Sequence, residues 1–216
     1  MRSTLIGRFL LLSIVCLIVL LPLWYWAAPW FAAPPIWLAG TVMKALFPAW
    51  VEHWSQQGVN ATLITLVQVR VGVAGGGDAF GELIPEVSYS TYGYGLALLW
   101  AMLIAARLVA PTPRWWLKGL AGSVVLIPVQ AWGICFQWLR DVALLSGPSG
   151  AAYLQYSDWA NNAIAYGYQL GVLMLPPVTP ILLWLLLNKR FVAALWLEAA
   201  LAGAPEHSQT PRPPGA

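Results

Sequence analysis

Four long apolar runs divide this chain, and they constrain its fold more than any other feature. They cover residues 9–30, 92–109, 115–139 and 159–187. A helix of about 20 apolar residues, rising 1.5 Å per residue, crosses the hydrocarbon core of a membrane. Apolar residues make up 60% of the chain and charged residues 9%, whereas soluble domains average roughly half and a quarter. We therefore predict an all-α membrane protein with four transmembrane helices.

The four runs predict four parts of the chain. Residues 1–30 form an N-terminal transmembrane anchor, 31–90 a periplasmic insertion, 91–190 a three-helix transmembrane region and 191–216 a cytoplasmic tail, disordered at its proline-rich end. The first run could also be a signal peptide. Its length and the aromatic belt at its end favour an anchor, and removal of this helix by cleavage stays open.

The insertion is predicted to hold an interfacial helix followed by a short β element. Large apolar residues recur at helical spacing over 36–54 among charged ones, as in a helix lying on a membrane surface. Valines alternate with other residues over 67–73, the period of two of a half-buried strand. The nearest partner is 83–89, joined through the glycines at 75–77. Pro85 would confine that partner to a sheet edge.

Basic residues orient the four helices. Short cytoplasmic loops carry an excess of Lys and Arg. Eight of the eleven basic residues fall on one predicted side: Arg2, Arg8, Arg107, Arg114, Lys118, Lys189, Arg190 and Arg212. Lys44, Arg70 and Arg140 fall on the other. We predict a multi-pass protein of the inner membrane with both termini cytoplasmic, and a tight hairpin turn at 110–114.

The fourth run contains Pro176, Pro177 and Pro180. A proline inside a helix removes a hydrogen bond and kinks it, so we predict a helix broken near mid-depth. Broken helices bind substrates in some transporters. A small transporter or lipid-handling protein is therefore one hypothesis, although the chain has neither an internal repeat nor a charge buried within a run.

Cys135 is the one candidate catalytic residue, with Arg140 as a group that could favour its thiolate. A spacing of five does not place the two on one helix face. Cys16 and Cys135 both lie in apolar runs, where cysteine is ordinarily a small buried hydrophobe. A membrane thiol-dependent enzyme that uses Cys135 remains an alternative to a non-enzymatic protein.

The sequence predicts no metal and no cofactor. His53 and His207 fall on opposite predicted sides, and no cysteine or carboxylate cluster has ligand spacing. The glycines at 75–77 lack the lysine and helix start of a phosphate-binding loop. The slight positive charge comes from helix ends, so we expect membrane lipid and no nucleic acid as a partner.

Polar and small residues mark a face that could contact another helix or a partner. Amides are costly in lipid unless they face another helix or a cavity, and glycines allow helices to approach closely. The candidates are Tyr92, Gly93, Tyr94, Gly95, Gln130, Trp132, Gly133, Asn161, Asn162, Gly167, Gln169 and Gly171. Gly167 and Gly171 have the small-xxx-small spacing of helix contacts.

Two stretches resemble a known family. They are Tyr92-Gly93-Tyr94-Gly95-Leu96, and Pro128-Val129-Gln130-Ala131-Trp132-Gly133 with Cys135-Phe136. With the four-helix layout, they resemble the bacterial exosortase H-associated membrane proteins over roughly residues 85–190. The resemblance implies a role accessory to a membrane sorting enzyme, which processes exported proteins bearing a C-terminal motif, a transmembrane helix and a basic end. The chain lacks that enzyme's own cysteine, arginine and histidine in separate membrane segments.

The leading hypothesis is therefore a non-enzymatic accessory or scaffold protein of an exosortase-type sorting system. Its partner would be a larger integral membrane protein, an exosortase-like enzyme, or the transmembrane helix of that enzyme's substrate.

Overall fold

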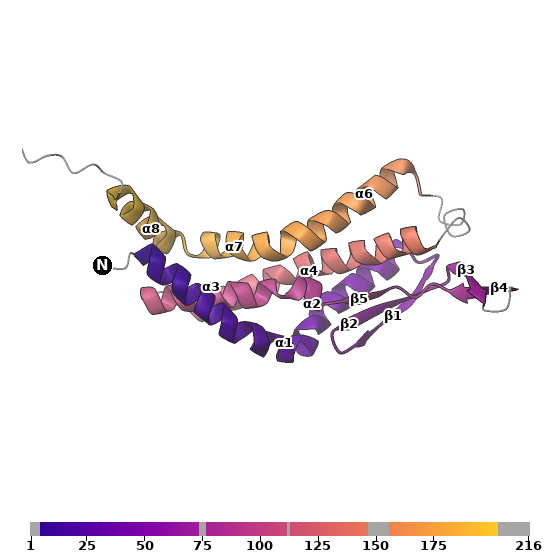
Figure 1. The fold of residues 1–216 in the computed structure, drawn as a ribbon, viewed down its shortest axis with the longest axis horizontal. Coiled ribbons are helices and arrows are strands. Elements are labelled where there is room, and N and C mark those ends of the chain that lie inside the picture. Colours follow the sequence, from indigo (N-terminus) through magenta and orange to yellow (C-terminus); the bar gives the residue numbers. More distant parts are fainter. Residues whose placement is uncertain (1–4, 74–76, 112, 147–155, 203–216) are drawn as a thin grey trace, which may run out of the picture.

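The structure is a computed structural model that describes residues 5–73, 77–111, 113–146 and 156–202. Its first element, α1 (Leu5–Leu46), is a single helix that continues through Pro22, Pro29, Pro34 and Pro35. It bends within its proline-containing stretch (Figure 1). The separate interfacial helix predicted over 36–54 is wrong: residues to Leu46 extend α1, and the chain is a strand from Val51.

Burial explains why α1 survives its prolines. Ala28, Ala32, Ile36, Ala39 and Met43 are buried at spacings of three and four, so one face of the helix packs along its whole second half. Helical stability in proteins comes mostly from such packing rather than from intrinsic propensity. At 1.5 Å per residue the 42 residues measure roughly 63 Å, about twice the hydrocarbon core. The helix is therefore longer than a single membrane crossing requires.

Two small sheets follow α1. The first has the strand order β1–β2–β5, from β1 (Val51–Gln57), β2 (Asn60–Thr65) and β5 (Glu86–Ser88), all antiparallel. Gly58, with φ +62°, makes the two-residue turn between β1 and β2. The second sheet pairs β3 (Gln68–Val73) with β4 (Gly77–Glu82).

The prediction of a strand over 67–73 is confirmed, but its partner is different. Gly77–Glu82, which lies between the two predicted strands, forms β4, and the segment after Pro85 pairs with β2 instead. Pro85 lacks an N–H, yet its carbonyl accepts a hydrogen bond from Leu63 N at 3.0 Å. In the strand order β1–β2–β5, β5 lies at the edge of its sheet, the position that a neighbouring proline favours.

The remaining helices are α2 (Ser90–Gly93), α3 (Gly95–Val109), α4 (Trp115–Leu145), α6 (Asp158–Gln169), α7 (Leu175–Leu187) and α8 (Lys189–Ala202). A π-helical turn, η1 (Leu170–Met174), joins α6 to α7 just before Pro176. Such turns accommodate breaks in the regular helix ladder. The break in the fourth run is thus a π turn.

Four helical segments are long and apolar enough to cross a membrane: Leu5–Leu46, Ser90–Val109, Trp115–Leu144 and Asp158–Leu187. They confirm the predicted all-α membrane class with four spans and a small sheet insertion between the first two. The tail predicted from 191 begins within α8. Its proline-rich end, Arg2, Arg212, His207 and the glycines 75 and 76 lie outside the described residues.

Three contacts align the helices at one level. The rings of Trp24 and Tyr89 lie 6.2 Å apart, Gly133 packs against the ring of Tyr92, and Gly171 against Gly133. Since β5 runs into α2 here, this level marks one end of the second span. Beyond it lie the second half of α1, the end of α4, α6 and both sheets, which we call the sheet end (Figure 1).

The sheet and the helices of this end are joined through specific side chains. Trp138 Nε1 on α4 donates to Ala61 O on β2 at 3.3 Å. Gln56 Nε2 donates to Pro29 O on α1 at 3.0 Å, and the Trp54 ring lies directly over Gly40. The three-stranded sheet is therefore packed directly on α1 and α4.

The opposite end of the bundle, which we call the basic end, holds the start of α1, the α3–α4 turn and α8 (Figure 1). Leu5 N donates to Glu198 Oε1 at 2.9 Å, and Phe9 stacks on Trp184 with ring centroids 4.8 Å apart. The basic residues described there are Arg8, Arg107, Arg114, Lys118, Lys189 and Arg190. Basic residues are thus concentrated at one end of the long axis. The positive-inside rule describes such a concentration on the cytoplasmic side of a membrane protein.

Candidate functional site

Buried tyrosines and amides link α2 to α4 where the second span begins. Tyr92 is buried and its hydroxyl donates to Gln137 Oε1. Tyr89 is also buried, and its hydroxyl donates to Gln130 Oε1 at 3.4 Å. Both glutamine amides therefore have partners within the protein, which removes the cost of burying them unpaired.

Burial has an electrostatic consequence at Tyr89. Tyr89 precedes the second span, and desolvation of its phenol raises its pKa above the ordinary value of 10.0. The hydrogen bond to Gln130 acts in the opposite direction and is the weaker effect. Tyr89 therefore stays neutral over the physiological range and acts as a hydrogen-bond donor.

An ion pair lies one turn further along α4. Arg140 Nε donates to Asp141 Oδ1 at 2.9 Å, and Arg140 Nη2 donates to the same oxygen. The guanidinium also lies over the ring of Tyr168 on α6, with Cζ 4.1 Å from the ring centroid. Arg140 is thus held by a carboxylate and an aromatic face together.

Glycines bring the fourth segment against α4. A Cβ at Gly167 would collide with the Phe136 ring, and a Cβ at Gly171 would stand 3.0 Å from Gly133 Cα. Trp132 Nε1 donates to Gly167 O at 3.2 Å. The indole reaches this carbonyl because α6 lies so close to α4. Gly95 similarly lies against Pro176 and Pro180. These contacts set the spacing between α3, α4 and the broken helix.

Most of the residues singled out in the sequence meet at these interfaces. Tyr92, Gly95, Gln130, Trp132, Gly133, Gly167 and Gly171 join neighbouring helices, Gly93 lies under the Tyr89 ring, and Tyr94 is half-buried. Asn161, Asn162 and Gln169 instead lie exposed on α6. Within the described part of the chain, the side-chain amides of these three residues make no hydrogen bond.

Exposed residues of α6 form a stripe along the helix. Trp159, Asn162, Tyr166 and Gln169 follow spacings of three, four and three, and we call them the α6 stripe. Trp159 is 79% exposed and Tyr166 71% exposed. Ile164 and Gly167 are buried on the opposite face. This spacing places all four side chains on one face of the helix.

The structure separates the candidate catalytic pair. Cys135 is buried, and its Sγ lies 3.6 Å from Ala39 O on α1. Arg140 is engaged with Asp141 and Tyr168 toward α6. The thiol and guanidinium are therefore directed at different neighbours, and Cys135 has no cationic partner among the residues that the structure describes. Cys16 is half-buried in α1, and both thiols are free.

Over the described ranges, no three His, Cys, Asp or Glu side chains come together to form a metal site. The sequence patterns missed Tyr168, the aromatic partner of Arg140. Its position one residue after Gly167 was the available signal, since a helix held close by glycine brings its neighbouring side chains within reach of α4.

The fold defines a class: a multi-helix integral membrane protein whose spans are locked by glycine contacts and carry a packed sheet insertion at one end. Residues 3–191 match the family described as exosortase H-associated membrane protein. That match covers most of the chain, and the protein belongs to this family. The resemblance seen in two short motifs is therefore confirmed and extends well beyond residues 85–190. Neither the curated proteins nor the solved structures compared with the chain gave a match.

Proposed function

We propose that this protein is a non-enzymatic accessory or scaffold of an exosortase-type bacterial protein-sorting system. In this role it resides in the inner membrane with both termini in the cytoplasm, and the sheet end faces the periplasm. Family membership supports the link to an exosortase. The segregation of basic residues to one end supports the orientation.

The observation that carries the proposal is the α6 stripe. Its two aromatic residues are large and exposed, and they alternate with amides that have no hydrogen-bond partner among the described residues. Tyrosine and tryptophan are enriched at protein interfaces, and amides hydrogen-bond between membrane helices. A helix of the sorting enzyme, or of its substrate, would cover the stripe and satisfy both kinds of side chain.

The thiol chemistry needed for a catalytic role has no support in this geometry. A nucleophilic cysteine needs a lowered pKa and access to substrate. Cys135 is buried against α1, and no described cation lies beside it to stabilise its thiolate. The residues around it hold helices together, so we assign Cys135 to packing.

Site-specific photo-crosslinking tests the proposal. A benzoyl-phenylalanine replaces Tyr166 in the α6 stripe, and in a matched strain it replaces Tyr25, which is 66% exposed on α1. Both strains carry the exosortase-type enzyme and a sorted substrate. We expect a crosslinked product with the enzyme, or with the substrate's helix, at position 166 and none at 25. Absence of a product at 166, or equal products at both positions, would contradict the assignment.

A further inference from the structure

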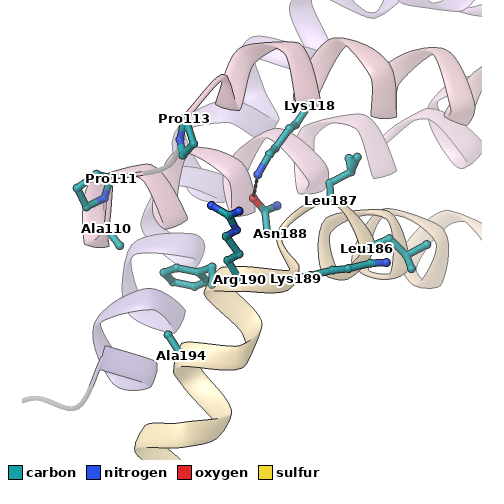
Figure 2. A pocket seen from close by; sticks show the side chains of 11 residues that line it. Ala110, Pro111, Pro113, Lys118, Leu186, Leu187, Asn188, Lys189, Arg190 and Ala194 are labelled. Atoms are coloured by element: carbon teal, nitrogen blue, oxygen red, sulfur yellow. Dashed lines mark hydrogen bonds between the residues drawn. The ribbon is translucent and has the colours of Figure 1, made fainter.

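A cavity of about 540 Å³ opens at the basic end, away from the α6 stripe. Its walls are the α3–α4 turn, the end of α7 and the start of α8 (Figure 2). The volume falls within the range of small-molecule binding sites. It is thus large enough to hold a polar headgroup.

Cations from two helices reach this cavity. Lys118 comes from α4, and Lys189 and Arg190 open α8. Figure 2 shows Lys118 and Arg190 directed toward Asn188, whereas Lys189 extends beside Leu186. Lys118 and Arg190 both line the cavity. Two like charges held together in this way favour the binding of an anion.

Asn188 fixes the position of Lys118. It is only 2% exposed, its Nδ2 donates to Trp184 O at 3.0 Å, and its Oδ1 accepts from Lys118 Nζ at 2.9 Å. The ammonium is therefore held at the cavity wall by a neutral partner. Its positive charge is oriented but not cancelled.

No carboxylate neutralises this group within the described part of the chain, where neither Lys118, Lys189 nor Arg190 forms an ion pair. The carboxylate described at this end, Glu198, accepts from Leu5 N instead. The cations that line the cavity are therefore not neutralised by a described carboxylate.

Apolar side chains complete the lining. Leu187, Phe191, Pro111 and Pro113 also line the cavity. The site therefore offers cations to a charged headgroup and a hydrocarbon surface to the acyl chains attached to that headgroup. It lies where the apolar spans α3 and α7 end, the depth at which phospholipid phosphates reside.

We propose that this cavity binds the phosphate group of an anionic membrane phospholipid, with Lys118 and Arg190 as the direct ligands. Basic pockets between membrane helices recognise such headgroups. A zwitterionic lipid is a poorer ligand because its own cation cancels the phosphate charge. Inorganic phosphate shares the ligand chemistry but lacks the acyl chains that contact Leu187 and Phe191.

Native mass spectrometry of the full chain in neutral detergent tests this site. The protein is titrated with phosphatidylglycerol, with phosphatidylcholine and, separately, with inorganic phosphate. The variant pair Lys118→Gln with Arg190→Gln is compared with Arg8→Gln and Arg107→Gln, which remove two cations of the same end outside the cavity lining. Thermal unfolding of each variant confirms that it is folded.

We expect phosphatidylglycerol to bind more tightly than phosphatidylcholine. The Lys118→Gln and Arg190→Gln pair should weaken phosphatidylglycerol binding by about fivefold for each lost cation. The Arg8→Gln and Arg107→Gln pair should change phosphatidylglycerol binding by less than twofold. Equal losses in both pairs would overturn the site in favour of general surface charge. Equal binding of both lipids, or saturation by inorganic phosphate that blocks phosphatidylglycerol, would overturn the lipid assignment. Crosslinking at Tyr166 is independent of all these outcomes.

Discussion

Gly171 on the broken fourth helix lies against Gly133 on α4, so close that a Cβ at residue 171 would stand 3.0 Å from the Gly133 Cα. The neighbour is backbone and cannot move aside as a side chain could. Gly133 itself lies against the Tyr92 ring. One glycine pair therefore fixes the separation of three helical segments.

A larger residue at 171 should separate these segments. We expect Gly171→Val to lower the thermal unfolding temperature in detergent by roughly 2–10 °C, because overpacking costs about 1–3 kcal/mol. Ala165→Val, at an exposed position of α6, should shift it by less than 2 °C. Fluorescence-detected size exclusion after heating measures both. Equal shifts would remove the close contact as the cause.

The α6 stripe should lose its partner when its amides become apolar. We expect Asn162→Leu with Gln169→Leu to reduce co-purification of the exosortase-type enzyme by at least fivefold, because the partner's polar groups lose their hydrogen bonds. Ile18→Ala on α1, also an exposed position, serves as the control. Unchanged recovery with the double variant would argue that another surface binds the enzyme.

Removal of the Cys135 thiol should leave sorting intact. Because its Sγ lies against Ala39 O on α1, we expect Cys135→Ala to retain at least half of the wild-type processing of a sorted substrate. Arg140→Gln should behave likewise in processing. Cleavage of the substrate is followed by immunoblotting. Processing reduced a hundredfold by Cys135→Ala, with the protein present at normal levels, would establish a catalytic thiol instead.

The Arg140–Asp141 pair should be coupled to Tyr168. We expect Tyr168→Phe to keep the thermal stability, since the aromatic face under the guanidinium remains. Tyr168→Leu should lower the unfolding temperature by a few degrees in a background with Arg140, and less in an Arg140→Gln background. Equal effects in both backgrounds would show that the ring contributes through packing alone.

The raised pKa of Tyr89 predicts that the protein loses stability at alkaline pH. Its folded pKa is raised by burial, so ionisation of the unfolded phenol favours unfolding once the pH passes about 10. Stability from this group is complete below pH 10 and falls progressively above it. In thermal unfolding between pH 9 and 11, Tyr89→Phe should show a shallower decline than wild type. Tyr25→Phe, at an exposed site, should decline as steeply as wild type.

Hydropathy alone located the four spans, because a helix that crosses the hydrocarbon core must be long and apolar whatever its tertiary contacts. The extent of α1 escaped prediction since Pro34 and Pro35 are strong local breakers, whereas the burial of Ala32, Ile36 and Ala39 depends on helices distant in sequence. Local alternation predicted β3 but not its hairpin partner β4, because Gly77–Glu82 lacks the apolar alternation of β3. The pairing of β5 with β2 joins segments that are distant in sequence, which local alternation cannot predict.

At the site, the close glycine contacts and the burial of Gln130 could be expected from the sequence, whereas Asn161, Asn162 and Gln169 lie exposed. The pairing of Arg140 with Tyr168, the burial of Cys135 against α1 and the basic cavity could not be expected from it. Each joins residues from different spans. Lys118, Lys189 and Arg190 marked orientation in the sequence, and only their convergence in space indicates a binding site.

Because α1 belongs both to the membrane bundle and to the support of the sheet, the two cannot tilt independently. A protein pulling on the sheet would exert a torque on the first span, and the proline-bearing bend is where that torque would be absorbed or transmitted. The length of one helix thereby makes the insertion a lever on the lipid-embedded bundle.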